Sequence, residues 1–167
     1  MKKISKKISD HISFKEATYS ATAKRLGIKN TPSEDHIENM QLVSEKIFEP
    51  LREWADHPIR INSMFRSEEL NSRVGGAISS AHKDGLAIDL DSIGSKTNLE
   101  LFHYIKDNLE FDVLINEYPN QDGDPKWIHV SWNKKKNRKH VLEIKRKGKY
   151  YTYTDCKGCK WKKLNLL

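Results

Sequence analysis

Residues 80–89 read Ser-Ala-His-Lys-Asp-Gly-Leu-Ala-Ile-Asp, and this stretch sets a histidine and a carboxylate seven residues apart, across a glycine. The pattern alternates towards its end, so Ile88 would face one side of a strand and Asp89 the other. We therefore expect Asp89 to project from a sheet whose reverse face belongs to the core. Gly85 permits the tight turn that brings His82 back towards Asp89.

A second imidazole follows forty residues later, in the segment Trp-Ile-His-Val-Ser at residues 127–131. Its alternation predicts a strand in which His129 shares a face with Trp127. Two histidines and an aspartate form the kind of three-ligand set that holds a catalytic zinc ion and leaves the fourth position for water. Zinc lowers the pKa of that water to about 7. We predict that His82, Asp89 and His129 hold one zinc ion.

Hydrolysis also needs a general base, and two acidic residues compete for that role. Glu117 ends a predicted strand at residues 112–118, which should neighbour the strand of His129. Asp124 is closer to His129 in sequence, but it lies in an Asp-Gly-Asp-Pro turn, where solvated acids are common. We favour Glu117 as the base.

Three further residues are candidates for contacts with substrate. Arg66 follows a predicted strand at residues 59–64, where its guanidinium can hold a substrate carboxylate or a developing oxyanion. Ser80 can form a hydrogen bond beside the metal or the substrate, and Trp127 shares the face of His129. A structural arginine and a loop-capping serine are the alternative interpretations, and the sequence leaves them open.

Length and composition indicate one soluble domain. The chain has 167 residues, of which 37% are hydrophobic and 32% charged. That length suits a single core, and no apolar run approaches the roughly 20 residues of a membrane span. The first residues carry positive charge without the apolar segment of a signal peptide, so we expect no secretory export.

The charge of the chain is concentrated at its C-terminal end. Residues 133–167 carry a formal charge of +11, whereas residues 11–132 carry −7. We divide the chain into a single domain at 1–154 and a basic tail at 155–167. The tail is suited to a polyanion, and nucleic acid, an anionic lipid surface and anionic cell-wall polymers all qualify, but a merely solvated tail is an equal alternative. No nucleic-acid motif is present. The lone Cys156-x-x-Cys159 pair is too small for a zinc ribbon and is interpreted as incidental or weakly structural.

Capping signals and periodicity predict an α+β domain, an antiparallel sheet with helices packed on one side. One capping box at Ser13 begins a helix that should end near Gly27, and another helix should begin with Pro32 at its first position. Pro50 should kink that second helix. The remaining predicted elements are helices at 68–74 and from 98, strands at 59–64, 86–91, 112–118 and 127–132, and a hairpin at 140–146 and 149–154.

These residues together resemble the zinc D-Ala-D-Ala carboxypeptidase / L-alanyl-D-glutamate endopeptidase family, whose fold is similar to that of the hedgehog signalling domain. The family's Ser-x-His-x-x-Gly-x-Ala-x-Asp signature is matched at every fixed position of residues 80–89, and its closing Trp-x-His at Trp127 and His129. Its Ser-x-x-Arg-Ser, Val-Gly-Gly and, in the phage branch, Leu-Ile-x-Glu-Tyr motifs match residues 63–67, 74–76 and 114–118. The resemblance covers roughly residues 12–150.

The resemblance implies a peptidase that cuts the peptide stems of peptidoglycan with zinc held by His82, Asp89 and His129. It places the base at Glu117, as in the phage branch. The leading hypothesis is an L-Ala–D-Glu endopeptidase of the endolysin kind, a monomer that stays in the cytoplasm until it is released to act on the cell wall. A D-Ala-D-Ala carboxypeptidase and a non-catalytic wall-binding module with a retained zinc site are the alternatives.

Overall fold

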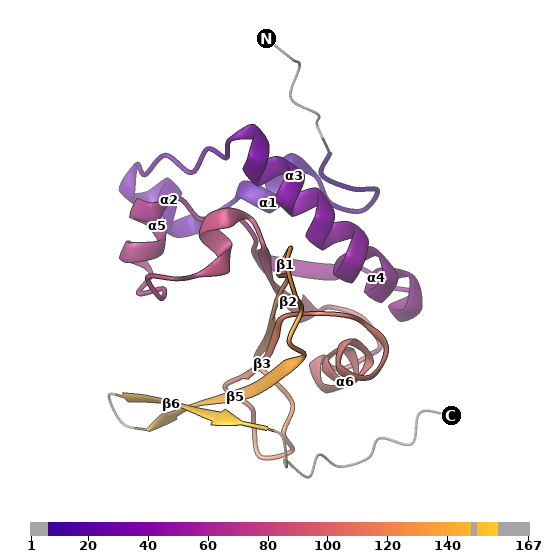
Figure 1. Cartoon of the computed structure of the whole chain (residues 1–167). Coiled ribbons are helices and arrows are strands. Elements are labelled where there is room, and N and C mark those ends of the chain that lie inside the picture. Colours follow the sequence, from indigo (N-terminus) through magenta and orange to yellow (C-terminus); the bar gives the residue numbers. More distant parts are fainter. Residues whose placement is uncertain (1–6, 148–149, 157–167) are drawn as a thin grey trace.

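A six-stranded sheet forms the centre of the protein. The computed structural model describes residues 7–147 and 150–156. The strands lie in the order β1-β2-β4-β3-β5-β6, and an α+β fold is thereby confirmed (Figure 1). Their bounds are β1 (Ile59–Ser63), β2 (Ala87–Ser92), β3 (Val113–Glu117), β4 (Trp127–Ser131), β5 (His140–Lys147) and β6 (Tyr150–Asp155).

The sheet is antiparallel except at one pair, because β5 runs parallel to β3. The loop after β4 passes to the far side of β3, so that β5 returns antiparallel to β4 and therefore parallel to β3. Two backbone hydrogen bonds fix the position at which β5 begins: the N–H of Lys139 donates to Phe111, and the N–H of His140 donates to Asp112. The parallel pair was not predicted, because it arises from a connection between β4 and β5 that passes over one strand of the sheet, β3.

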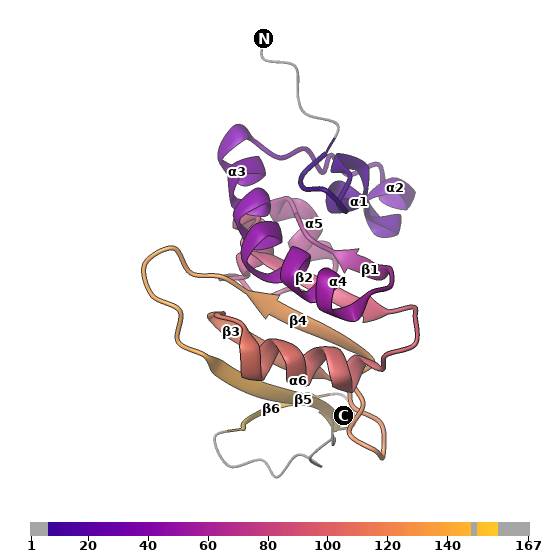
Figure 2. The same ribbon diagram turned by 90° about the vertical axis from the view of Figure 1, so that its right-hand side faces the viewer.

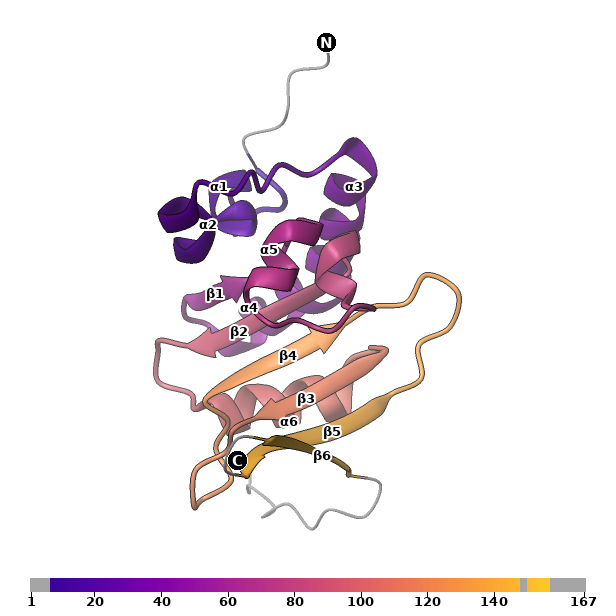
Figure 3. The same ribbon diagram turned by 90° about the vertical axis from the view of Figure 1, so that its left-hand side faces the viewer.

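Helices cover one face of the sheet and leave much of the other to the site. α3 (Glu34–Val43), α4 (Glu49–Ala55) and α6 (Asn98–Asn108) lie on the covered face (Figure 2). Their apolar side chains form one core with those of Ile88, Leu90, Leu114, Ile128 and Val130 from the strands. Figure 3 shows the opposite face, with α5 (Glu68–Arg73) above β2 and with β5 and β6 below β3. The alternation around Asp89 therefore has the expected consequence, a core on one side and polar residues on the other.

The long second helix is interrupted before Pro50. A π-helical segment, η1 (Ser44–Phe48), separates α3 from α4 and places Pro50 in the first turn of α4. Because proline has no N–H, it cannot continue the hydrogen-bond ladder, and the wider turn accommodates that loss. The helix begins after Ser33 rather than at Pro32, since Ser33 and His36 form a reciprocal cap.

The first helix is broken in two, contrary to the sequence prediction. α1 (Phe14–Thr18) ends at Tyr19, which is extended, and Ser20 then caps α2 (Ala21–Leu26). The amide of Asn30 donates to the carbonyl of Thr18 at 2.9 Å, so a tertiary contact replaces the helical bond there. Gly27 ends α2 in the left-handed region, as predicted.

The C-terminal part of the sheet is a β5–β6 hairpin, as predicted. Its turn at residues 148–149 lies outside the described residues, as do Cys159 and residues 157–167 of the basic tail. β6 ends at Asp155, and the N–H of the next residue, Cys156, donates to Val141. The division between domain and tail stays a prediction. Among the described residues no helix is long and apolar enough to cross a membrane.

Gly85 allows the 3-10 helix η2 (Ala81–Asp84) to turn tightly into β2. Its φ is +71°, and a Cβ at this position would lie 2.7 Å from the backbone oxygen of His36. Two separate constraints, a left-handed backbone and a close approach to α3, therefore exclude a side chain.

We predict that Gly85→Ala lowers the free energy of unfolding by about 2–4 kcal/mol, because backbone strain and overpacking act together. Gly27→Ala is the matched control, since Gly27 has a φ of +67° with no atom near the added Cβ. It should cost about 1 kcal/mol. Urea unfolding measures both, and equal losses would contradict the close approach.

Candidate metal centre

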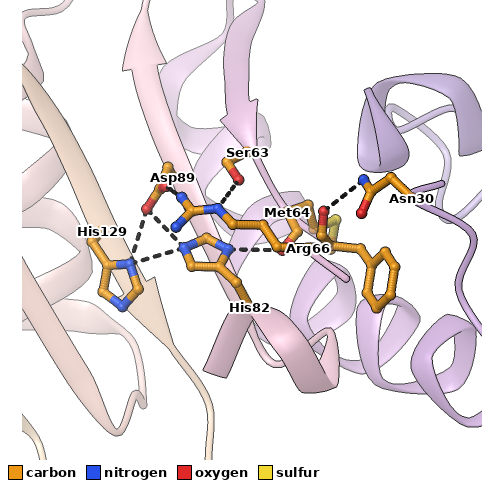
Figure 4. A network of polar contacts seen from close by, with 8 residues as sticks. Asn30, Ser63, Met64, Arg66, His82, Asp89 and His129 are labelled. Carbon is orange, nitrogen blue, oxygen red and sulfur yellow. Dashed lines mark hydrogen bonds and ion pairs between the residues drawn. The ribbon is translucent and has the colours of Figure 1, made fainter. Parts of the chain in front are cut away.

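Strand pairing brings the three expected ligands together. Asp89 on β2 and His129 on β4 are direct partners in the antiparallel register, and both project from the uncovered face. His82 lies in η2, which precedes β2 (Figure 4). Their ligand atoms form a triangle: His82 Nε2 is 3.1 Å from Asp89 Oδ1 and 3.2 Å from His129 Nδ1, and His129 Nδ1 is 2.9 Å from Asp89 Oδ1.

The size of this triangle suits a metal ion. Ligand atoms about 2.0–2.1 Å from a tetrahedral zinc ion lie roughly 3.3 Å from one another. The three ligand-atom separations fall slightly below that value. These residues are the one group of three or more candidate ligands found within the described part of the chain.

Hydrogen bonds among the three ligand atoms do not satisfy all of them. His82 Nδ1 lies 2.7 Å from the carbonyl of Met64, which can only accept, so Nδ1 carries the hydrogen. In the neutral ring Nε2 then turns a lone pair towards Asp89 Oδ1, another acceptor. Burial lowers the pKa of His82, which disfavours the imidazolium that would remove this conflict. A cation bound by both atoms removes it instead.

Asp89 is held as an anion by the groups around it. Burial raises the pKa of its carboxyl, but the two rings outweigh burial and hold the pKa well below its usual range, His82 through the charge that its ring carries when protonated and His129 through a hydrogen bond. Its second oxygen, Oδ2, accepts from Arg66 Nη2 at 2.5 Å. Oδ1 thus faces the two imidazoles, while the hydrogen bond from Arg66 holds Oδ2 on the other side. Carboxylate ligands of metals are commonly held by such a second hydrogen bond.

Arg66 lies among the ligands rather than away from them. Its Nε donates to Ser63 Oγ at 2.7 Å, its Nη2 binds Asp89, and its side chain is 19% exposed. This arrangement suits a residue that orients Asp89. A direct contact of Arg66 with substrate stays a prediction.

Glu117 lies on the same face of the sheet as the three ligands. It is two residues beyond Ile115, the residue of β3 that pairs with His129. Glu117 itself pairs with Trp127. Burial raises the pKa of Glu117 to about 7; the nearby Asp89 raises it further, whereas His129 and Arg66 oppose the rise. Its competitor Asp124 accepts from the N–H of Leu99 at 2.6 Å and so caps α6. Geometry therefore favours Glu117 over Asp124, and the role itself stays a prediction.

A cleft of about 870 Å³ lies over these residues. Ser80, Glu117 and Trp127 line it together with Arg66 and the three ligands. The ring of Trp127 lies 5.0 Å from that of Tyr118, which also lines the cleft.

The cleft also contains residues that the sequence did not single out, notably Tyr19 and Arg138. Tyr19 follows a helix break, and Arg138 stands in a lysine-rich segment, so neither carries a local signal.

Comparison with known families adds an independent observation. The family model for peptidase M15 matches residues 10–131, more than half of the chain. The chain belongs to the peptidase M15 family. This M15 peptidase is accordingly a metallopeptidase, and the zinc dependence of its family agrees with the donor set of the triangle. No curated protein matches the chain. The matched residues end with β4, so β5 and β6 lie beyond them.

We predict that the metal-free protein binds one equivalent of zinc and that zinc raises its melting temperature. Free zinc at 100 times Kd corresponds to about 2.7 kcal/mol of added stability. His129→Ala should abolish the rise, whereas His11→Ala, which removes an exposed imidazole, should retain it. Calorimetric titration and thermal unfolding measure both quantities. A rise that survives in His129→Ala would contradict this ligand set.

We also predict that Glu117→Gln stabilises the metal-free protein at alkaline pH. A carboxyl whose folded pKa is raised from 4.5 to about 7 favours folding most below pH 4.5, and this advantage disappears as pH rises through 7. Glutamine does not titrate, so the variant should gain on wild type between these pH values, by up to about 3 kcal/mol above pH 7. Urea unfolding in chelator at pH 5 and 8 tests this, and a difference independent of pH would refute it.

Proposed function

We propose that this M15 peptidase hydrolyses the peptide stems of bacterial peptidoglycan at the L-Ala–D-Glu bond, with one zinc ion. The observation that carries the proposal is the position of the metal triangle in the floor of a cleft that continues past it. Along β4, Trp127 lines the cleft on one side of His129 and Ser131 on the other. An endopeptidase needs such room, because substrate residues extend on both sides of the bond that it cuts.

Zinc supplies a Lewis acid that polarises the peptide carbonyl and makes water nucleophilic at neutral pH. In this proposal Glu117 takes a proton from the attacking water and gives it to the departing amine of D-Glu. The new bond joins the water oxygen to the carbonyl carbon of L-Ala, and the C–N bond breaks. A base whose pKa is near 7 suits both transfers.

Other side chains have supporting roles in the same proposal. Arg66 keeps Asp89 Oδ2 occupied, so that Oδ1 faces the site. Ser80 and Trp127 line the cleft and contact the bound peptide, Trp127 through its ring and Ser80 through its hydroxyl. Each contact adds orientation to the peptide before the bond is cut.

The setting in which the enzyme works is also a proposal. We infer that it remains in the cytoplasm until release, acts on the cell wall in the manner of an endolysin, and works as a monomer. The basic tail would hold the enzyme near anionic wall polymers through its charge. This tail, residues 155–167, lies almost wholly outside the described part of the chain.

The proposal is tested by digesting purified peptidoglycan and identifying the released ends by mass spectrometry. Wild-type enzyme should release new N-terminal D-Glu, and chelator should abolish the release until zinc is restored. Glu117→Gln should lower the rate by about 10²–10⁴-fold while zinc stays bound, because one proton transfer is lost.

Each alternative gives a different result in this experiment. Free D-Ala would indicate a D-Ala-D-Ala carboxypeptidase, and wall binding without new ends would indicate a binding module. Full activity of Glu117→Gln would exclude Glu117 as the base. Activity that persists after verified metal removal would exclude the zinc mechanism.

A further inference from the structure

Two arginines are the cationic side chains among the described residues that line the cleft. Arg66 is largely buried and holds Asp89 and Ser63, so its guanidinium is committed to the metal centre. Arg138 differs, because 57% of its side chain is exposed. A cation that is both fixed and accessible is the kind of group that recognises an anionic substrate.

The guanidinium of Arg138 is fixed along one edge. Its Nε and Nη2 donate to the two oxygens of Asp112, each at 2.7 Å, and its backbone N–H donates to Asp112 Oδ1. Asp112 is nearly buried, with 10% of its side chain exposed. Among residues 7–147 and 150–156 it is the ion-pair partner found for Arg138. The bidentate pair therefore orients the plane of the guanidinium and leaves the Nη1 edge to a ligand.

Arg138 lies at a defined end of the cleft. The N–H of Asp112 donates to the carbonyl of Ser131, the residue two positions past His129 on β4. Two residues of strand span about 6.6 Å. Glu117 and Trp127 lie in the opposite direction from His129, two residues away in the register. The two ends of the cleft therefore differ. The expected base lies at one end, the metal triangle in the middle, and the Arg138–Asp112 pair at the other end.

We propose that Arg138 is a specificity-determining residue that binds a carboxylate of the peptide stem, on the first or second residue beyond the bond that is cut. The inference rests on the proposed function. One residue of extended peptide spans at most about 3.6 Å, so the separation along β4 corresponds to such a distance. Arg138 also lies beyond the family-matched residues 10–131, so this selectivity would belong to the part of the chain outside the match.

The stem offers two carboxylates of this kind. D-Glu is joined to the next residue through its side-chain carboxyl, and its α-carboxylate remains free beside the cleaved L-Ala–D-Glu bond. The C-terminal carboxylate of a short stem is the second source. Either would accept a charge-assisted hydrogen bond from Nη1. The α-carboxylate of D-Glu suits the proposed reaction best, because it is present in every stem that is not amidated at D-Glu.

The test compares matched soluble peptides, one with D-Glu and one with D-isoglutamine, in which the α-carboxylate is an amide. Wild-type enzyme should prefer the acid, and Arg138→Gln should lower kcat/KM for the acid about 10- to 100-fold while changing the amide little. The loss should appear in KM rather than in kcat, because a ground-state contact is removed. Arg138→Lys should restore part of the preference.

The ratio of the two substrates guards against a folding defect, because lost stability lowers both rates together. Lys139→Gln is the matched control: it removes a neighbouring exposed cation that pairs with Glu110 and does not line the cleft, and it should leave the ratio unchanged. A third peptide with an amidated C-terminus assigns the source. If C-terminal amidation, rather than D-isoglutamine, removes the effect of Arg138→Gln, the terminal carboxylate is the ligand.

Failure of the inference is distinguishable from failure of the proposed function. Cleavage of the peptides with relative rates, across all three, that Arg138→Gln leaves unchanged would overturn the role of Arg138 and leave the endopeptidase intact. Absence of cleavage of all three peptides would overturn the endopeptidase. In that case equilibrium binding of the three peptides to wild type and Arg138→Gln still decides the inference, which is refuted if the substitution leaves their relative affinities unchanged.

Discussion

The antiparallel pairing of Asp89 with His129 is the contact on which the metal centre depends. In this register the two side chains stand directly opposite each other on one face, and a shift by one residue would turn His129 into the core. Ile88, Leu90, Ile128 and Val130 oppose such a shift, since all four are fully buried on the reverse face. The hydrophobic core therefore determines the geometry of the site by fixing which residues remain on the other side.

One loop between β1 and α5 positions the other components. The carbonyl of Met64 accepts a hydrogen bond from His82, and the guanidinium of Arg66 donates one to Asp89, so two of the expected ligands are oriented from a single short segment. Asn30 in turn binds the carbonyl of Phe65 and the N–H of Ser67, the residues on either side of Arg66. The N-terminal region is thus coupled to the metal centre through hydrogen bonds rather than through a direct contact. Such outer partners commonly adjust affinity and geometry in metal sites.

The sequence was most informative where a local pattern and a tertiary consequence coincide. Alternation around Asp89 and His129 predicted two strands and the face that each side chain takes, because burial of one face follows from the period of a strand. Gly85 was expected for its turn, yet its contact with His36 depends on where α3 lies. The break at Tyr19 depends on a hydrogen bond from Asn30, which lies outside the helix, to the carbonyl of Thr18. The parallel start of β5 depends on a bond from His140 to Asp112, which is far from it in sequence. Arg138 appeared as one cation in a basic segment, and only its pairing with Asp112 places it in the cleft.

The spacing of the three expected ligands has a consequence for the stability of the fold. His82 and Asp89 belong to one short segment, whereas His129 follows Asp89 by forty residues and by way of α6 and β3. An ion held by all three bridges this long loop in the folded protein, and it stabilises the fold by binding there, whereas a disulfide acts by constraining the unfolded chain. Unlike a disulfide, this cross-link forms without an oxidant and comes apart with a chelator. The same ion that serves the chemistry thus couples the two central strands across a large part of the chain.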